Sequence, residues 1–209
     1  MSASLPICVV TIGPTREPID SMRLISNRST GDLGTHLALS LHGNGHPVIA
    51  LRGLGSTSDP TPLKEAGIQV IPFDSTRDLQ DALEELSRGQ IRGTIFHTAA
   101  VSDYFLPGAG AGKIPSDGGT LTLALEPTPK LLPRMTGWFP GAKVIGWKFE
   151  AGGTREEALT AGRRQISNCG THACVVNGPS YGEGFGLLSP DGALLHFADR
   201  RALCDHLAG

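Results

Sequence analysis

The sequence predicts an α/β protein: a three-layer α/β/α Rossmann-like fold with a mostly parallel sheet and a small β extension that serves as a flap or for dimerisation. Short, nearly continuous apolar runs alternate along the chain with amphipathic helical patterns, which is typical of parallel strands buried on both faces. A long polar connection after the first run and a glycine-rich segment at 105–112 interrupt this alternation. The 209 residues suffice for one substantial core, so we expect a single domain over 1–209 with a flap at about 105–127.

The first half of the chain alternates strands and helices. Apolar residues at helical spacing predict a helix at Asp32–Gly43, which the following Gly-rich residues end. Asp74, Ser75 and Thr76 offer N-caps for a helix at 77–87. Apolar, β-branched runs predict strands at 7–10, 47–51, 68–72 and 93–100, and residues 62–67 form a short helical turn.

The second half continues the pattern around the flap. Thr128 as N-cap and Pro129 at the first helical position predict that a helix starts there. In Thr120–Leu125 the three leucines alternate onto one side, which predicts a strand of the flap or of a dimer arm. Strands at 143–149 and 172–177, helices at 154–167 and 199–207, and a hairpin at 186–197 complete the prediction.

Composition excludes several classes of protein. The net charge of −2 and the pI near 6.4 argue against a nucleic-acid-binding protein, which would carry a basic patch. No apolar run is long enough to span a membrane, and the first residues, MSASLP, lack the features of a signal peptide, so we expect a cytoplasmic protein. Cys8, Cys169, Cys174 and Cys204 have no C-x-x-C spacing and are expected to be free thiols, with Cys8 and Cys174 in the core.

The connection from Thr11 to Gly34 is unusually long and polar for a link between a strand and a helix. Arg16, Arg23 and Arg28 suit phosphate or carboxylate groups. The run from 26 to 31 places hydroxyls, an amide and a glycine before a helix, where backbone N–H groups favour an anion. The same residues also fit a surface loop whose arginines face water, and spacing alone leaves both readings open.

A second candidate site follows the strand at 93–100. Its carboxyl end carries His97, Thr98, Ala99, Ala100 and Asp103, and open α/β sheets bind ligands at this end of their strands. The alanines would let a ligand approach the backbone, and the carboxylate could accept from a base or a hydroxyl. The alternative is packing for the alanines and a turn or cap role for Asp103.

Two strings move the balance toward function. GPTREPID followed by R-x-I-S-N-x-S-x-G-x-x-G resembles the first motif of the phosphopantothenate–cysteine ligase (phosphopantothenoylcysteine synthetase) family of coenzyme A biosynthesis. A-A-V-x-D-Y, at Ala99–Tyr104, is similar to the second motif of that family, whose members bind a nucleotide there. The resemblance continues through the lysine at 113, the T-P-x-x-L string at 128–132, the aromatic residue at 147 and the asparagine at 177. It spans about 7–196 in the same order.

The resemblance implies roles for particular residues. Asn27, Arg23 and Lys113 fall on positions that are catalytic in the family. Asn27, Arg23 and Ala100 are the implied contacts to the acid and amine substrates, and no protein side chain is implied as a metal ligand. The implied nucleotide contacts are Gly13, Ser29, Gly31, His97, Thr98, Ala99, Asp103, Lys113, Pro129, Lys130, Leu131, Leu132, Trp147 and Arg164. Trp147 would stack on the base, although a tryptophan in a strand is more often a core residue.

The sequence departs from the family at two places. Many members have a second lysine two residues after the position of Lys113, and this chain has Pro115 there. The helix at 154–167 usually ends in lysines that reach the triphosphate. Arg163 or Arg164 can replace one of these cations, but Asn168 replaces the other. A catalytically weak nucleotide-binding relative therefore stays an alternative. An NAD(P)-dependent reductase is disfavoured, because the first strand–helix connection has no G-x-G-x-x-G.

The family resemblance implies a two-step ligation. The carboxylate of 4′-phosphopantothenate attacks the α-phosphate of CTP or ATP, with Mg²⁺ required, and the amine of L-cysteine then displaces the nucleotide. The sequence does not decide between CTP and ATP. Because the first motif follows directly on the N-terminus, we expect a standalone ligase without the flavin-dependent decarboxylase half and without FMN. The family also implies a homodimer.

Overall fold

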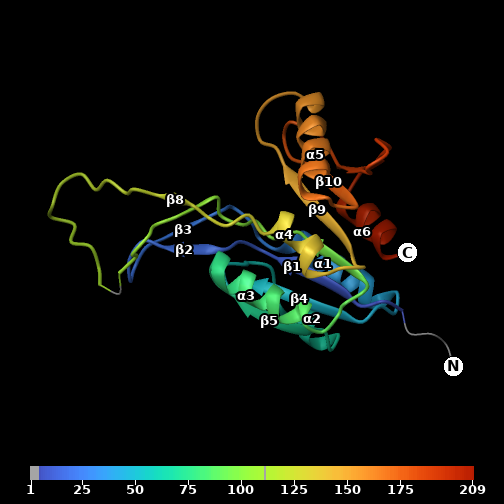
Figure 1. The fold of residues 1–209 in the computed structure, drawn as a ribbon, viewed down its shortest axis with the longest axis horizontal. Helices are drawn as coiled ribbons and strands as arrows, with labels where there is room; N and C mark the ends of the chain where they lie inside the picture. The colour runs from blue at the N-terminus through green and yellow to red at the C-terminus, as the bar shows by residue number, and fades with distance from the viewer. Residues whose placement is uncertain (1–4, 111) are drawn as a thin grey trace.

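An eight-stranded, mostly parallel sheet forms the centre of the computed structural model, which describes residues 5–110 and 112–209 (Figure 1). Residues 1–4, which belong to the stretch that lacks the features of a signal peptide, lie outside the described residues, and so does residue 111 of the flap. The strand order is β12-β11-β10-β9-β6-β1-β4-β5. The parallel strands are β1 (Cys8–Ile12), β4 (Val48–Gly53), β5 (Gln69–Phe73), β6 (Thr94–His97), β9 (Lys143–Phe149) and β10 (Ala173–Asn177).

Two antiparallel strands, β11 (Phe185–Leu188) and β12 (Leu194–Phe197), extend the sheet at one edge as the predicted hairpin. The chain runs from β1 outward through β4 to β5, and then returns to the other side of β1 with β6, β9 and β10. The order of the strands therefore reverses between β1 and β6. In open α/β sheets the crevice at such a switch point is where ligands bind.

Helices cover both faces of the sheet, as the alternating sequence pattern predicts. One core cluster joins one face to α1 (Asp32–Gly43), α2 (Thr61–Glu65) and α6 (Arg200–Ala208). On the other face pack α3 (Thr76–Ser87) and α4 (Leu132–Trp138), with α5 (Arg155–Cys169) over β9 and β10. The predicted three-layer fold is confirmed. Cys8 and Cys174 are buried, as expected, and the four cysteines are free thiols.

Capping explains where the longer helices begin. Ser75 and Asp78 form a capping box at the start of α3, and Thr154 and Glu157 form another at the start of α5. The Asp199 side chain accepts from the Ala202 N–H at the start of α6. Helix α1 instead starts after Gly31, whose φ of 78° is left-handed and favours glycine.

Three features of the sequence prediction are wrong. The strand expected at 93–100 ends at His97, because residues 98–100 leave the sheet to lie beside Gly13 and Thr15. Thr120–Leu125 forms no strand, and its alternating leucines lie on an irregular segment instead. The helix expected from Thr128 begins only at Leu132, because Thr128 is held elsewhere: its N–H donates to the Asp103 carbonyl (3.0 Å) and its hydroxyl to the Ser102 carbonyl.

A projecting arm is the part of the fold that the sequence did not predict in this form. The long connection after β1 contains a hairpin of β2 (Arg16–Pro18) and β3 (Leu24–Ser26). The segment between β7 (Tyr104–Phe105) and β8 (Glu126–Pro127) extends from the body of the molecule in the same direction (Figure 1). We call these two segments, residues 16–26 and 104–127, the arm.

Candidate functional site

A cavity of about 990 Å³ opens at the carboxyl ends of the central strands, beside the switch point. The lining comes from the loop before α1 and the first turn of α1, from the segment after β6 and the approach to α4, and from one face of α5. The ends of β9 and β10 complete it, the latter with Asn177. The lining includes most of the predicted site residues, namely Asn27, Ser29, His97, Thr98, Ala99, Ala100, Asp103, Pro129, Lys130, Leu131, Leu132, Trp147 and Arg164. The cavity is large enough for a nucleotide-sized ligand.

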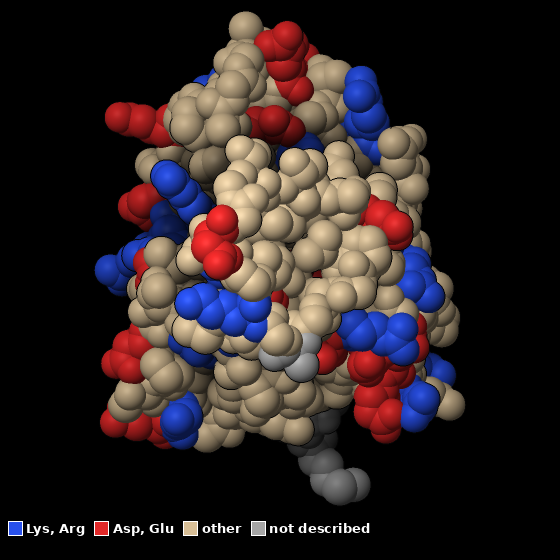
Figure 2. Space-filling model, turned by 90° about the vertical axis from the view of Figure 1, so that its left-hand side faces the viewer, with Lys and Arg blue, Asp and Glu red and all other residues tan. Residues whose placement is uncertain are grey.

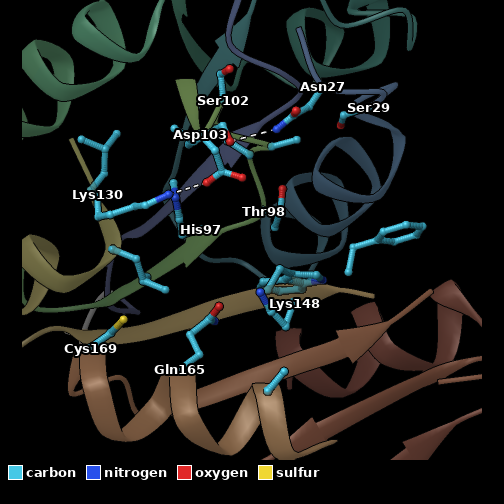
Figure 3. A pocket seen from close by; sticks show the side chains of 18 of the residues that line it. Asn27, Ser29, His97, Thr98, Ser102, Asp103, Lys130, Lys148, Gln165 and Cys169 are labelled. Carbon is cyan, nitrogen blue, oxygen red and sulfur yellow. Dashed lines mark hydrogen bonds and ion pairs between the residues drawn. The ribbon is translucent and has the colours of Figure 1, made fainter. Parts of the chain in front are cut away.

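Asn27 lies on the loop before α1 and reaches across to the segment after β6 (Figure 3). Its amide nitrogen donates to the Val101 carbonyl at 2.9 Å. The loop itself is held by Ser26, whose hydroxyl donates to the Thr15 carbonyl at 2.8 Å. With the nitrogen of Asn27 engaged by the protein, the amide oxygen is left to accept from a ligand.

An ion pair between Asp103 and Lys130 crosses the cavity mouth (Figure 3). Both side chains are largely exposed, so the pair contributes little to the stability of the fold. Lys130 is brought there by the Thr128 hydrogen bonds that delay the start of α4. Because α4 begins only at Leu132, residues 129–132 form part of the cavity wall.

Four cationic side chains line the cavity. Lys148 pairs with Glu150 at 3.2 Å and Lys130 pairs with Asp103. Arg28 and Arg164 take part in none of the ion pairs between described residues. The lining therefore has two cations in excess, which favours an anionic ligand.

His97 is buried in the cavity wall, with 8% of its surface exposed. Its Nδ1 lies 2.9 Å from the Thr11 hydroxyl oxygen. Burial lowers the pKa of His97 to about 4, so the imidazole is neutral at physiological pH.

The sequence left two interpretations of Trp147 open, a surface that stacks on the base and a core residue, and its position is compatible with both. The half-buried ring packs against the core cluster under α1, and the residue also lines the cavity. Its Nε1 is buried and has no partner among the described residues.

Gly13 and Gly31 do not line the cavity, and both pack on Ser56. A Cβ on Gly13 would lie 1.8 Å from the Ser56 hydroxyl oxygen, and one on Gly31 would lie 2.9 Å from the same atom. The φ angles of 81° and 78° also favour glycine. These two glycines shape the turns that lead from β1 into the arm and from the arm into α1.

Arg23 and Lys113 lie on the arm and not in the cavity. The Arg23 guanidinium contacts Asp20 at 2.7 Å and donates to the Ile114 carbonyl at 3.3 Å. Arg23 also lines a smaller cavity of about 370 Å³ beside the hairpin. Lys113, next to Ile114, is exposed. The structure thus places Arg23 beside the segment that carries Lys113, and neither of the two lines the cavity with Asn27.

Sequence reasoning gave no site role to several lining residues, among them Ser102, Lys148, Gln165 and Cys169. Ala161, Arg164, Gln165 and Asn168 also line the cavity, and their spacing of three and four residues places them on one face of α5. This helical spacing in the sequence could have predicted that the four residues face one ligand site. The described residues contain no group of three or more His, Cys, Asp or Glu side chains that could hold a metal ion. None of the helices in this part of the chain is long and apolar enough to cross a membrane.

The DNA/pantothenate metabolism flavoprotein C-terminal domain family matches residues 6–202. The chain belongs to this family. Among curated relatives, the coenzyme A biosynthesis bifunctional protein CoaBC of Thermococcus kodakarensis is 34% identical over 169 residues, which is 81% of this chain and 40% of that protein. The chain therefore spans less than half the length of this curated relative. The family assignment agrees with the resemblance inferred from the motifs.

Solved structures share the fold of this flavoprotein C-terminal domain. The DNA/pantothenate metabolism flavoprotein from Streptococcus pneumoniae superposes with a TM-score of 0.80, at 22% identity, over 97% of this chain and 96% of that one. A Cab2 variant in complex with phosphopantothenate-cysteine gives 0.79, at 20% identity, over 97% of this chain and 83% of that one. At these identities the likeness concerns the fold.

Proposed function

We propose that this domain is a phosphopantothenate–cysteine ligase that joins 4′-phosphopantothenate to L-cysteine through an acyl-nucleotidylate. The observation that carries the proposal is the cavity at the switch point, where Asn27, the segment 97–103 and the face of α5 that carries Arg164 meet. The curated relatives are coenzyme A biosynthesis proteins, and a solved structure of the same fold was determined with phosphopantothenate-cysteine.

The first step is nucleotidyl transfer. A carboxylate oxygen of 4′-phosphopantothenate attacks the α-phosphorus of CTP or ATP, and the bond to the β-phosphate oxygen breaks to release pyrophosphate. Arg28 and Arg164, the two cavity cations without an acidic partner in the described part of the chain, would bind the phosphates. Mg²⁺ would travel with the phosphates of the nucleotide, since the described residues contain no cluster that could hold it.

The second step forms the amide. The amine of L-cysteine attacks the acyl carbon, the bond to the phosphate oxygen breaks, and CMP or AMP leaves with that oxygen. Asn27 would orient the acyl phosphate, with its amide nitrogen turned from Val101 or its oxygen accepting from the attacking amine. The reaction transfers no electrons, so we assign it no FMN.

Arg23 and Lys113 would act from the arm. Because both are exposed or half-buried outside the cavity, we propose that they reach a site only when the arm meets a second copy of the chain. Figure 2 looks onto the arm end, where uncharged atoms cover most of the centre. Met22, Leu24, Tyr104, Leu121 and Leu125 are exposed on the arm, Met22 by 72%. Such apolar exposure favours a homodimer. We place this homodimer in the cytoplasm.

The test is pyrophosphate release from purified protein with 4′-phosphopantothenate, Mg²⁺ and each nucleotide in turn. We expect release with CTP or ATP, and the ligated product after L-cysteine is added. Nucleotide binding without pyrophosphate release would instead support a catalytically weak relative, which the neutral Asn168 on the cavity face of α5 favours. Light scattering of the same sample tests the dimer, which a mass of one chain in an active enzyme would contradict.

A further inference from the structure

A row of four aligned residues crosses the sheet beneath the cavity. Thr11 of β1 aligns with His97 of β6, His97 aligns with Gly146 of β9, and Gly146 aligns with Cys174 of β10. Aligned residues on neighbouring parallel strands share one face of the sheet. A Cβ on Gly146 would meet side chains of α4 and α5, so the row lies on the face that these helices cover.

Hydrogen-bond accounting around Thr11 identifies the tautomer of His97. The Thr11 hydroxyl oxygen accepts from the Ala99 N–H at 3.1 Å, and it lies 2.9 Å from His97 Nδ1. No other acceptor for the hydroxyl proton lies among the described residues. A buried hydroxyl without an acceptor is costly, so the Thr11 hydroxyl donates its hydrogen bond to Nδ1 of His97. Nδ1 is then the acceptor, and Nε2 carries the hydrogen.

The Nε2–H of His97 is open to the cavity. Within the described parts of the chain, no group accepts from it. The buried side-chain atoms without a partner in the described residues belong to Arg52, Ser56, Trp147, Thr171 and Ser180. Since His97 Nε2 is not among them, this atom is accessible. Because His97 lines the cavity, the accessible Nε2 is reached from there.

Gln165 brings a second uncharged group to the same part of the cavity. Its amide nitrogen donates to the Cys174 sulfur at 3.2 Å. A Cβ on Gly146 would lie 2.4 Å from that nitrogen, so the missing side chain lets the amide lie against the sheet. The amide oxygen of Gln165 has no donor among the described residues. His97 and Gln165, on either side of Gly146, thus offer an uncharged donor and an uncharged acceptor.

We propose that His97 is a specificity-determining residue whose neutral Nε2–H donates to an uncharged oxygen or nitrogen acceptor of a substrate. This inference rests on the proposed ligase function. Arg28 and Arg164 come from other elements and serve the phosphates, which leaves the His97 donor for a neutral group. Two sources have this chemistry: the ring nitrogen or carbonyl of a nucleotide base, and the amide carbonyl of phosphopantothenate.

Nitrogen NMR of the His97 side chain tests the tautomer without any need for activity. We expect a neutral ring with hydrogen on Nε2 at pH 7 in the free protein. A Thr11→Val variant, which removes the hydroxyl donor, should shift the ring toward the other tautomer. Hydrogen on Nδ1 in the unaltered protein would overturn the inference even if the protein proves to be a ligase.

Calorimetric binding of CTP, ATP and 4′-phosphopantothenate to two His97 variants identifies the source. His97→Phe keeps a ring but has no donor, and one neutral hydrogen bond corresponds to roughly threefold to tenfold in affinity. His97→Gln keeps an N–H donor and should restore most of the loss. His46→Phe, far from the cavity, is the matched control. Weaker nucleotide binding identifies the base, weaker phosphopantothenate binding identifies its amide, and unchanged affinity for all three ligands overturns the inference.

Discussion

The Asp20 carboxylate accepts a hydrogen bond of 3.0 Å from the backbone N–H of Ile114, although 94 residues separate them. The same carboxylate accepts from the N–H groups of Met22 and Arg23, each at 2.8 Å, and pairs with the Arg23 guanidinium. These hydrogen bonds, first that from Ile114, lower the pKa of Asp20. Asp20 therefore joins the two segments of the arm and holds the residue that follows Lys113.

Asp20→Asn should loosen this connection. An amide carries less negative charge to accept the three N–H groups, and its own N–H₂ would face donors. We expect faster hydrogen exchange at the Ile114 amide and faster proteolysis within 105–127. Asp117→Asn, an exposed change in the same segment, is the control. Equal exchange rates in the two variants would contradict the role given to Asp20.

Asn27→Asp should bind nucleotide but turn over slowly. A carboxylate cannot donate to the Val101 carbonyl, nor to the acyl phosphate that we propose Asn27 orients. The loss of one donor to the charge that develops in the reaction costs about 10²–10³ in rate. Asn44→Asp is a matched control, because Asn44 also donates to a backbone carbonyl at 2.9 Å but lies at the other end of α1. The measurements are nucleotide affinity and pyrophosphate release. A turnover equal to that of the Asn44 control would show that Asn27 has no catalytic role.

Arg164→Gln should weaken nucleotide binding by roughly tenfold or more, because a hydrogen bond to a charged group is worth about 1.5–3 kcal/mol. Arg163→Gln provides the control on the same helix: Arg163 pairs with Glu156 at 2.8 Å and does not line the cavity. Titration at two salt concentrations should show a steeper salt dependence for the unaltered protein than for the Arg164 variant. Equal losses in both variants would argue for a general charge effect.

The stability of the protein should fall as the pH drops from about 6.5 to about 4. His97 has a folded pKa of about 4, below its ordinary value, so the unfolded chain binds a proton in this interval that the folded chain does not. Above pH 6.5 the neutral His97 makes its full contribution to the free energy of unfolding. At pH 5 the free energy of unfolding is lower by roughly 2 kcal/mol because of this one residue. Urea unfolding at pH 5 and pH 8 measures it. The difference between the two pH values should shrink in His97→Gln; an unchanged difference would contradict the assignment.

The sequence predicted the parts of this fold that depend on local patterns. Helix α1 begins and ends where its apolar spacing and following glycines predict, and β9 agrees equally well. The segment 97–103 was expected at the cavity because the carboxyl end of a parallel strand faces the ligand crevice.

Features that depend on distant contacts could not be predicted. The hairpin β2–β3 has strands of three residues, too short for a periodicity signal, and Glu17 within it is buried through its hydrogen bonds to Thr76 of α3. The local signal of Thr128 for a helix start is overridden by its bonds to Ser102 and Asp103. Arg23 and Lys113 have no local signal that places them on the arm and away from Asn27.

The most direct test of the central claim follows an oxygen atom. In the proposed route a carboxylate oxygen of 4′-phosphopantothenate becomes bonded to the α-phosphorus and stays there when L-cysteine displaces the nucleotide. With heavy oxygen in that carboxylate, mass spectrometry of the complete reaction should find one labelled oxygen in the CMP or AMP. Product formed with an unlabelled nucleotide monophosphate, or with label in inorganic phosphate, would contradict the acyl-nucleotidylate route.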